Sequence, residues 1–497
     1  MKKMAFLLVT IVLATLTIES IVVAAEEDEQ LQEEIIYNIV VDRYNNGDYS
    51  LDKQVRVDDP TAYQGGDLQG IIAKLDTFDE LGSTTLTLSP IMENAPDGYH
   101  GYWIEDLFEL EEQFGTMEDL NTLVEEAHKR DMKIVLEFVI NYVSASHPLV
   151  TDPEKSDWFS ESNDLTADWA DGIVVLNQDN EEVEDYLIEA AAYWMEETNI
   201  DGFKLHAADQ ASESFLENFT THIKGLDPDF YLLGDILDKD ADTEHLKENT
   251  AIQAIDNNML FESMNDVFSE AGNPVSDLYE AWEDNDQYGG LLYVDDKYTK
   301  RFTQAFAENG RNALTTWSLA LTYMYTTPGV PSIFQGSEIP MYGADAEEAQ
   351  RIVQFNSGDS DLKEFHNRIS SLRANFPVLS YGDFEIVGSS GAMSVFKRTY
   401  EDETMYIAIN NDEESQAVSV TGIDSGMQLR GYLGDNIVRE NDRGEFKIGL
   451  AREKAEVFVI EPDTGLNWLF IGFVAGVFLL FIIVIFMLSR KQKKQSV

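Results

Sequence analysis

The chain has 497 residues, of which 92 are Asp or Glu and 34 are Lys or Arg, so its formal charge is −58. This charge repels nucleic acid, which excludes DNA and RNA as partners, and it indicates a saline or alkaline habitat more than a particular chemistry. The lack of cysteine excludes disulfides, thiolate metal sites and cysteine nucleophiles.

The first 25 residues are typical of a signal peptide. Lys2 and Lys3 precede an apolar stretch over 4–16, and Val23-Ala24-Ala25 supplies small residues for cleavage. We therefore expect the chain to be exported and to begin at Glu26.

Between 26 and 379, short apolar runs alternate with amphipathic helical stretches. Strands are predicted over 36–41, 84–88, 133–140, 201–206, 230–233 and 290–294, and helices over 68–81, 120–129 and 183–197. Near-continuous apolar strands between helices favour a parallel sheet covered on both faces, and this many repeats predict a (β/α)8 barrel, an α/β fold. Within it, 133–140 is apolar apart from Glu137.

Two segments depart from this rhythm. Residues 142–176 are rich in Asp, Ser and Trp and predict a small B domain inserted between a barrel strand and its helix. Over 380–462 the apolar runs are strands without helices, which predicts a C-terminal all-β sandwich.

The C-terminus carries an apolar, charge-free run. Residues 468–488 are long enough to form a transmembrane helix, and the basic residues of 489–497 follow it. The positive-inside rule then predicts a single-pass protein of the cell membrane, with an extracellular ectodomain and a cytoplasmic C-terminal tail.

Several ordered motifs resemble the α-amylase family of glycoside hydrolases across nearly the whole predicted ectodomain. They are Asp42–Asp48 after the first strand, Gly65–Ile71 at the first helix, Tyr99–Trp103 in a sugar-facing loop, Asp201–His206, and Thr327–Pro331. Any one of them is weak evidence, but their common order is not expected by chance. The resemblance implies an amylase-type barrel that acts on α-glucans.

The departures from the family pattern lie where that family does its chemistry. By resemblance, the nucleophile position is His206, the general acid position is Asp235, and the transition-state-stabilising position is Tyr298. Retaining glycosidases need a carboxylate nucleophile and a carboxylic acid about 5 Å apart, and two of these three positions lack a carboxylate. Rescue by Asp209, Asp295 or Asp296 is conceivable because they lie near the same rim, but we expect these to be solvated loop acids and not replacements.

Sugar binding is expected to be less damaged than catalysis. The resemblance places Tyr99, His100, Trp103 and Lys204 at the substrate, although aromatic packing of this loop against the barrel explains part of the cluster equally well.

The resemblance also implies one calcium site, since oxygen ligands suit Ca²⁺. Its ligands would come from Asn46, Asp48, Gly65 and Asp67, and the alternative is a polar turn beside an ordinary helix cap at Asp67. No organic cofactor is expected.

The sequence leaves three hypotheses open. The leading one is a cell-surface α-amylase-family protein of α-glucan metabolism that is catalytically impaired but still binds oligosaccharides. The second is an active hydrolase or transglycosidase with a rebuilt site that uses Asp235 and a neighbouring acid. The third is a structural ectodomain that associates with a membrane-protein partner.

Overall fold

A computed structural model of the chain describes residues 30–160, 165, 168–285, 289–463, 465 and 468–495. The predicted signal peptide at 1–25 lies outside the described residues.

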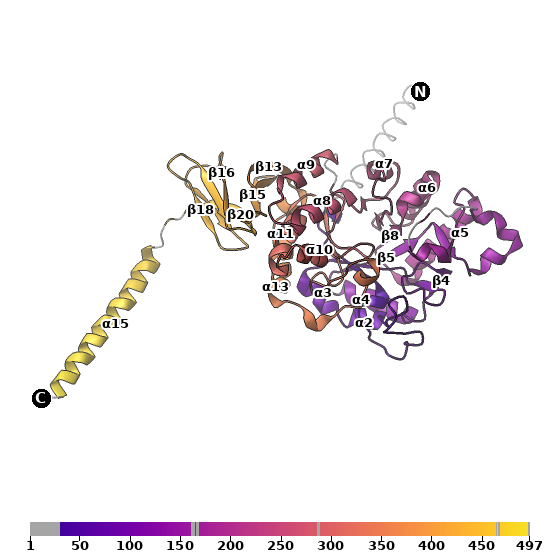
Figure 1. Ribbon diagram of the computed structural model, residues 1–497, viewed down its shortest axis with the longest axis horizontal. Helices are drawn as coiled ribbons and strands as arrows, with labels where there is room; N and C mark the ends of the chain where they lie inside the picture. Colours follow the sequence, from indigo (N-terminus) through magenta and orange to yellow (C-terminus); the bar gives the residue numbers. More distant parts are fainter. Residues whose placement is uncertain are drawn as a thin grey trace, which may run out of the picture.

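Eight parallel strands form the predicted barrel (Figure 1). In sheet order they run β10-β9-β8-β5-β2-β1-β12-β11, and an isolated parallel bridge between Asp256 and Leu291 joins the two outer strands and closes the ring. The strands are β1 (Ile36–Ile39), β2 (Thr85–Leu88), β5 (Lys133–Val139), β8 (Gly202–His206), β9 (Tyr231–Gly234), β10 (Ala254–Ile255), β11 (Leu291–Leu292) and β12 (Val330–Phe334). The (β/α)8 prediction is confirmed; β10 was missed from the sequence, and β12 was indicated only by the Thr327–Pro331 motif.

Helices follow the strands and cover the barrel. They are α2 (Leu68–Ile72), α3 (Leu75–Leu81), α4 (Met117–His128), α5 (Glu181–Thr198), α6 (Glu213–Leu226), α7 (Thr243–Asn249), α8 (Asn258–Ser269), α9 (Ser276–Asp284), α10 (Phe302–Glu308), α11 (Ala313–Thr326), α12 (Ala346–Ala349), α13 (Ser360–Asn375) and α14 (Val378–Tyr381). Their starts follow from the sequence: Thr116 and Asp119 form a capping box at α4, and the Asn180 side chain caps α5. The helix predicted over 68–81 is divided at Ala73 and Lys74 into α2 and α3.

The pleat of the barrel strands decides which side chains face inward. Val135, Leu233 and Val330 belong to an apolar cluster drawn from several barrel strands. Two residues further along β5 comes Glu137, which pairs in register with Lys204 of β8. Side chains alternate across a strand, so Glu137 points to the same face of the barrel as Val135. Glu137 also lies nearer the carboxyl ends of the strands, where barrel enzymes place their active sites.

The inserted segment is small. Strands β6 (Tyr142–Ser144) and β7 (Ile173–Val175) pair antiparallel and frame it, with short 3₁₀ turns between them. Another hairpin, β3 (Met92–Asn94) with β4 (Ile104–Leu110), carries the Tyr99–Trp103 loop.

The C-terminal region is all β, as predicted. A six-stranded sheet, in the order β13-β14-β15-β20-β17-β18, is accompanied by a two-stranded sheet of β16 and β19. The strands are β13 (Asp383–Ser390), β14 (Met393–Tyr400), β15 (Glu403–Asn410), β16 (Gln416–Val420), β17 (Met427–Gly431), β18 (Ile437–Arg439), β19 (Phe446–Leu450) and β20 (Lys454–Pro462).

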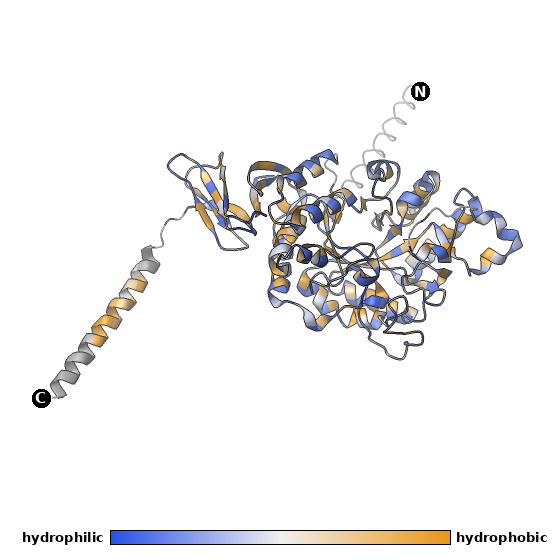
Figure 2. Ribbon diagram, viewed as in Figure 1, coloured by the Kyte–Doolittle hydropathy of each residue, from blue (hydrophilic) through white to orange (hydrophobic). Residues whose placement is uncertain are grey.

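The predicted membrane span at 468–488 falls within one helix, α15 (Trp468–Gln495), which extends away from the β-sandwich (Figure 1). The side chains of this helix are described for 472–485, and hydrophobic residues dominate there (Figure 2). Across the part of the chain that the structure describes, no helix meets the length and apolarity needed to cross a membrane. The span over 468–488 stays a prediction from the sequence.

Candidate functional site

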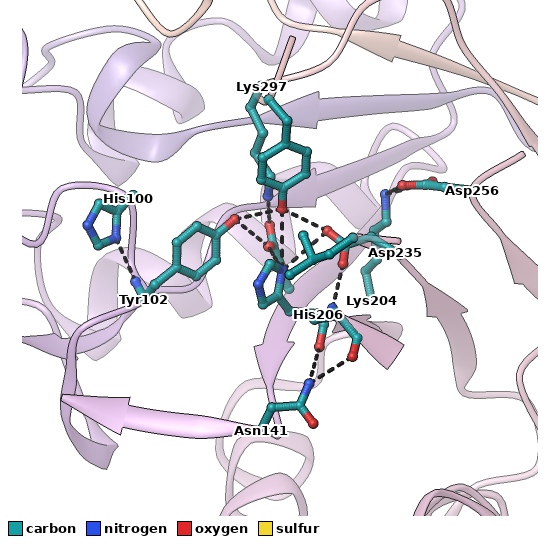
Figure 3. Close-up of polar contacts among 12 residues, drawn as sticks. His100, Tyr102, Asn141, Lys204, His206, Asp235, Asp256 and Lys297 are labelled. Atoms are coloured by element: carbon teal, nitrogen blue, oxygen red, sulfur yellow. Dashed lines mark hydrogen bonds and ion pairs between the residues drawn. The ribbon is translucent and has the colours of Figure 1, made fainter. Parts of the chain in front are cut away.

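The carboxyl ends of the barrel strands surround a cavity of about 880 Å³. Its walls bring together residues from several strand ends, including Tyr102, Glu137, Asp235, Asp256 and Tyr298. Two of the three positions predicted for catalysis, Asp235 and Tyr298, therefore line one cavity, and the buried His206 side chain contacts both of them. Figure 3 shows His206 beside Asp235.

His206 lies between two carboxylates at the floor of the cavity. Its Nδ1 is 3.0 Å from Oε1 of Glu137 and 3.2 Å from Oδ2 of Asp235. The three side chains are almost completely buried, with exposed fractions of 0%, 4% and 2%. One imidazole thus contacts the two acids that could otherwise face a substrate.

Two tyrosines and a lysine complete this group, which we call the His206 cluster: Tyr102, Glu137, His206, Asp235, Lys297 and Tyr298. The Tyr102 hydroxyl donates to Oε1 of Glu137 at 2.8 Å, and the Tyr298 hydroxyl donates to Oδ2 of Asp235 at 3.0 Å. The Lys297 ammonium is 2.5 Å from Oε2 of Glu137, and the Ala207 backbone N–H donates to Oδ1 of Asp235 at 2.6 Å. All four carboxylate oxygens therefore already accept a hydrogen bond or an ion pair.

The charges in the cluster stabilise one another. Burial alone would lower the pKa of His206, but Asp235 and Glu137 raise it above its ordinary value. Burial opposes ionisation of Asp235, yet His206 holds the pKa of that carboxyl well below its ordinary range. For Glu137 burial is likewise outweighed, by Lys297 first, and its pKa is lowered. These shifts favour a protonated His206 between two ionised carboxylates.

The same atoms form the one His/Asp/Glu group with metal-ligand spacing among the described residues. The potential ligand atoms of Glu137, His206 and Asp235 all lie within 4.8 Å of one another. However, the Lys297 ammonium already neutralises Glu137, and an added cation would have to displace it. The arrangement fits a proton on His206 better than a metal ion.

The turn that follows β8 is held from outside the cavity. Ala207 adopts a left-handed conformation with φ of 52°, and Asn141 donates to the carbonyl oxygens of His206 and Ala207 at 3.1 and 2.8 Å. Gln178 in turn donates to Oδ1 of Asn141 at 2.9 Å and accepts from the Ser212 backbone N–H. This chain of amides directs His206 towards Glu137 and Asp235.

The predicted sugar-facing loop lines the cavity, but not all of its rings are free. Tyr102 is stacked against His206, with ring centroids 4.4 Å apart, and also against His100. His100 is buried and accepts the Tyr102 backbone N–H through Nδ1, and burial lowers its pKa to about 3, so it is neutral. Tyr99 and Trp103 are only partly buried and remain the better stacking candidates, although the Arg43 guanidinium lies over the Tyr99 ring.

Lys204 also lines the cavity but contacts neither His206 nor Asp235 directly. Its ammonium lies 2.9 Å from both carboxylate oxygens of Asp256, beside the cluster (Figure 3). Burial and the nearby negative charges raise the pKa of Asp256 to about 6, although Lys204 opposes this shift.

The expectation that Asp295 and Asp296 are solvated loop acids is wrong. Asp295 is buried against Arg301 and accepts a hydrogen bond from Ser337. Oδ1 of Asp296 accepts from the backbone N–H groups of Tyr298 and Thr299. Both acids hold the loop after β11 in place, and neither reaches the cluster.

The residues predicted for calcium lie together in the loop before α2. The Asp67 carboxylate accepts the backbone N–H groups of Gly47, Asp48 and Gly70, and so caps α2. Oδ1 of Asp48 accepts a hydrogen bond from the Ser50 backbone N–H. Oδ1 of Asn46 is buried without a hydrogen-bond partner among the described residues. The fit to calcium is partial, because backbone amides already satisfy Asp67, while Asn46 offers a buried side-chain oxygen that has no hydrogen-bond partner within the described part of the chain.

Three residues of the site were not identified as functional from the sequence. Glu137 carried a signal, since it is the one acid in an apolar strand, and so did Lys297, which directly precedes the predicted position Tyr298, whereas Asp256 carried none. Their importance follows from their distances to His206 and Lys204, which only the barrel defines.

Models of known protein families match both the barrel and the C-terminal β region. Residues 38–171 and 168–373 match the α-amylase catalytic domain, and residues 382–458 match the α-amylase C-terminal domain.

Similar solved structures include an α-amylase from Anoxybacillus, 40% identical with a TM-score of 0.84, which covers 88% of this chain and 99% of its own. Another is the α-amylase from Geobacillus thermoleovorans in complex with acarbose, 38% identical with a TM-score of 0.82, covering 87% and 99%.

Curated relatives are more distant. A cyclomaltodextrinase from a Bacillus species is 26% identical over 440 residues, which are 80% of this chain and 76% of the relative. The β/α-amylase of Paenibacillus polymyxa is 27% identical over 458 residues, and the match spans 85% of this chain but only 37% of that relative's length.

Proposed function

The chain belongs to the α-amylase family of glycoside hydrolases, and from this premise we propose that it binds α-glucan oligosaccharides with its hydrolytic activity impaired or lost. Family membership supports the substrate class, and the geometry of the His206 cluster supports the loss of activity.

The carrying observation is the position of His206 Nδ1, 3.0 Å from Glu137 and 3.2 Å from Asp235. A retaining glycosidase needs a free carboxylate nucleophile and a protonated carboxyl group facing it across the glycosidic bond. Here the nucleophile position is an imidazole, and the acid position carries a carboxylate whose pKa is lowered and whose oxygens are all engaged. A carboxyl group that stays ionised at neutral pH cannot act as the proton donor.

Support for retained binding comes from the cavity. It remains about 880 Å³ in volume, and Tyr99 and Trp103 line it from the β3–β4 loop. A cavity with aromatic walls and a few polar groups suits a small oligosaccharide.

The test is to incubate the purified full-length protein with starch, maltodextrins and cyclodextrins, and to measure both reducing sugar and binding by calorimetry. We expect binding without release of reducing sugar. The His206→Asp, Tyr298→Asp double variant is assayed in parallel, because regained hydrolysis there would locate the loss at these two positions. Clear hydrolysis by the unmodified protein would overturn the proposal.

A second candidate function is an active glycosidase with a rebuilt site. The observation that favours it is the short distance between Glu137 and Asp235, whose nearest oxygens lie within 4.8 Å. If these two acids perform hydrolysis, Glu137→Gln and Asp235→Asn should each abolish a measurable activity. Asp266→Asn, an exposed acid on α8 away from the cavity, serves as the matched control.

Cellular location and calcium binding stay proposals from the sequence. Export and C-terminal anchoring in the cell membrane would be supported by alkaline-resistant membrane association together with protease sensitivity of intact cells. Release of the protein by alkali would count against the anchor. Co-purification with an integral membrane protein would favour the third hypothesis, a structural ectodomain that associates with a membrane-protein partner.

A further inference from the structure

Hydrogen-bonding capacity is unevenly used around the cavity. In the His206 cluster, Glu137 Oε1 accepts from His206 and Tyr102, and Oε2 from Lys297. Asp235 accepts at both oxygens as well. A sugar hydroxyl that approached these acids would have to displace an existing partner.

The Lys204–Asp256 pair differs. Both side chains line the cavity, with exposed fractions of 11% and 13%, and within the described part of the chain they bond only to each other through their side chains. An ammonium has three N–H donors and a carboxylate has about four lone-pair positions. After one mutual ion pair, both groups retain capacity at the edge of the cavity.

An aromatic wall belongs to the same region. The Phe261 ring, on α8, stacks on Tyr293 with ring centroids 4.7 Å apart and an interplanar angle of 19°. Both residues line the cavity together with Asp256. Phe261 is only partly buried, so part of its ring remains accessible.

We propose that Lys204, Asp256 and Phe261 form a binding subsite for one pyranose ring of an α-glucan oligosaccharide. This inference rests on the proposed function and names the part of the cavity that recognises the sugar. Neighbouring hydroxyl groups of a pyranose can donate to a carboxylate and accept from an ammonium, while the C–H face of the ring packs on an aromatic side chain. The pair therefore provides both halves of the polar contact, and Phe261 provides the apolar half.

The experiment is isothermal titration of maltoheptaose into the full-length protein and its variants. Asp256→Asn removes the charge at nearly constant shape, and loss of a hydrogen bond to a charged group should weaken binding by roughly tenfold to a hundredfold. Asp266→Asn is the matched control, because Asp266 is exposed on the same helix as Phe261 and does not line the cavity. Thermal unfolding of each variant checks that it is folded.

Phe261→Ala is the second variant, and it tests the same subsite without disturbing the ion pair. Weaker binding in Asp256→Asn and Phe261→Ala, with unchanged binding in Asp266→Asn, supports the subsite. If the unmodified protein binds maltoheptaose and both cavity variants bind within twofold of it, the subsite is refuted while the proposed function stands. If the unmodified protein binds no α-glucan at all, the proposed function fails and this inference fails with it.

Discussion

Replacing His206 with Asn tests the central ion cluster directly. Asn keeps a hydrogen-bonding amide but removes the positive charge that lies 3.0 Å from Glu137 and 3.2 Å from Asp235. At an effective dielectric constant near 20, each contact of about 3 Å carries roughly 5 kcal/mol of Coulomb attraction, part of which offsets the burial of the charges. Removing one partner of a buried ion pair typically costs about 3–5 kcal/mol, and we expect a loss of that size in the free energy of unfolding.

The loss should depend on pH in a defined direction. Folding raises the pKa of His206, so its contribution is complete below the unfolded pKa of about 6.5 and disappears as pH rises through the folded pKa. Folding lowers the pKa values of Glu137 and Asp235, which has the opposite effect on stability. Their contribution to the free energy of unfolding is present above their ordinary pKa values near 4 and is lost as pH falls. The penalty of His206→Asn should therefore be largest between about pH 5 and 6.5 and decline towards alkaline pH.

His366→Asn is the matched control, measured by urea unfolding with tryptophan fluorescence at several pH values. His366 is also buried, and burial lowers its pKa to about 4, so it is neutral over this range. Its unfolded form gains a proton below about pH 6.5 and its folded form does not, so the penalty of its replacement should shrink as pH falls below about 6.5 and stay flat from about pH 7 to 9, the opposite of the trend expected for His206→Asn. A flat penalty for His206→Asn, or one equal to that of His366→Asn, would refute an imidazolium between two carboxylates.

Three further outcomes are expected. Tyr298→Phe removes the hydroxyl that donates to Asp235 and should cost about 1–3 kcal/mol in urea unfolding, so an unchanged midpoint would exclude this bond as a stabilising contact. Asn141→Ala frees two backbone carbonyls of the turn after β8 and should likewise cost about 1–3 kcal/mol; a neutral effect would mean that the turn holds itself. Calcium added back after chelation should raise the melting temperature if Asn46 and its neighbours bind the ion, and an unchanged curve would leave Asp67 as a helix cap alone.

Much of the fold could be predicted because it depends on local pattern. The apolar strand over 133–140, the helix after 180 and the β-rich region beyond 380 are each visible within about ten residues of sequence. The two-residue strand β10 was missed because so short a run carries no periodicity. The split between α2 and α3 was missed because its apolar spacing continues through the break.

The site was predicted only in part. Motif order located His206, Asp235 and Tyr298, and the structure brings these three side chains together. It did not show that Glu137 would be the second acid on His206, nor that Lys204 would pair with Asp256. Glu137 and His206 are 69 positions apart, and their contact depends on the register in which Val139 pairs with His206.

By itself, the sequence determined which chemical groups stand at the carboxyl ends of the strands, because strand order and the alternation of side chains are written locally along the chain. Only the tertiary structure decided which of those groups neutralise one another. Closing the barrel sets the distances between side chains of different strands. At about 3 Å, every carboxylate oxygen of the His206 cluster already has a partner, whereas Lys204 and Asp256 keep unused hydrogen-bond donors and acceptors.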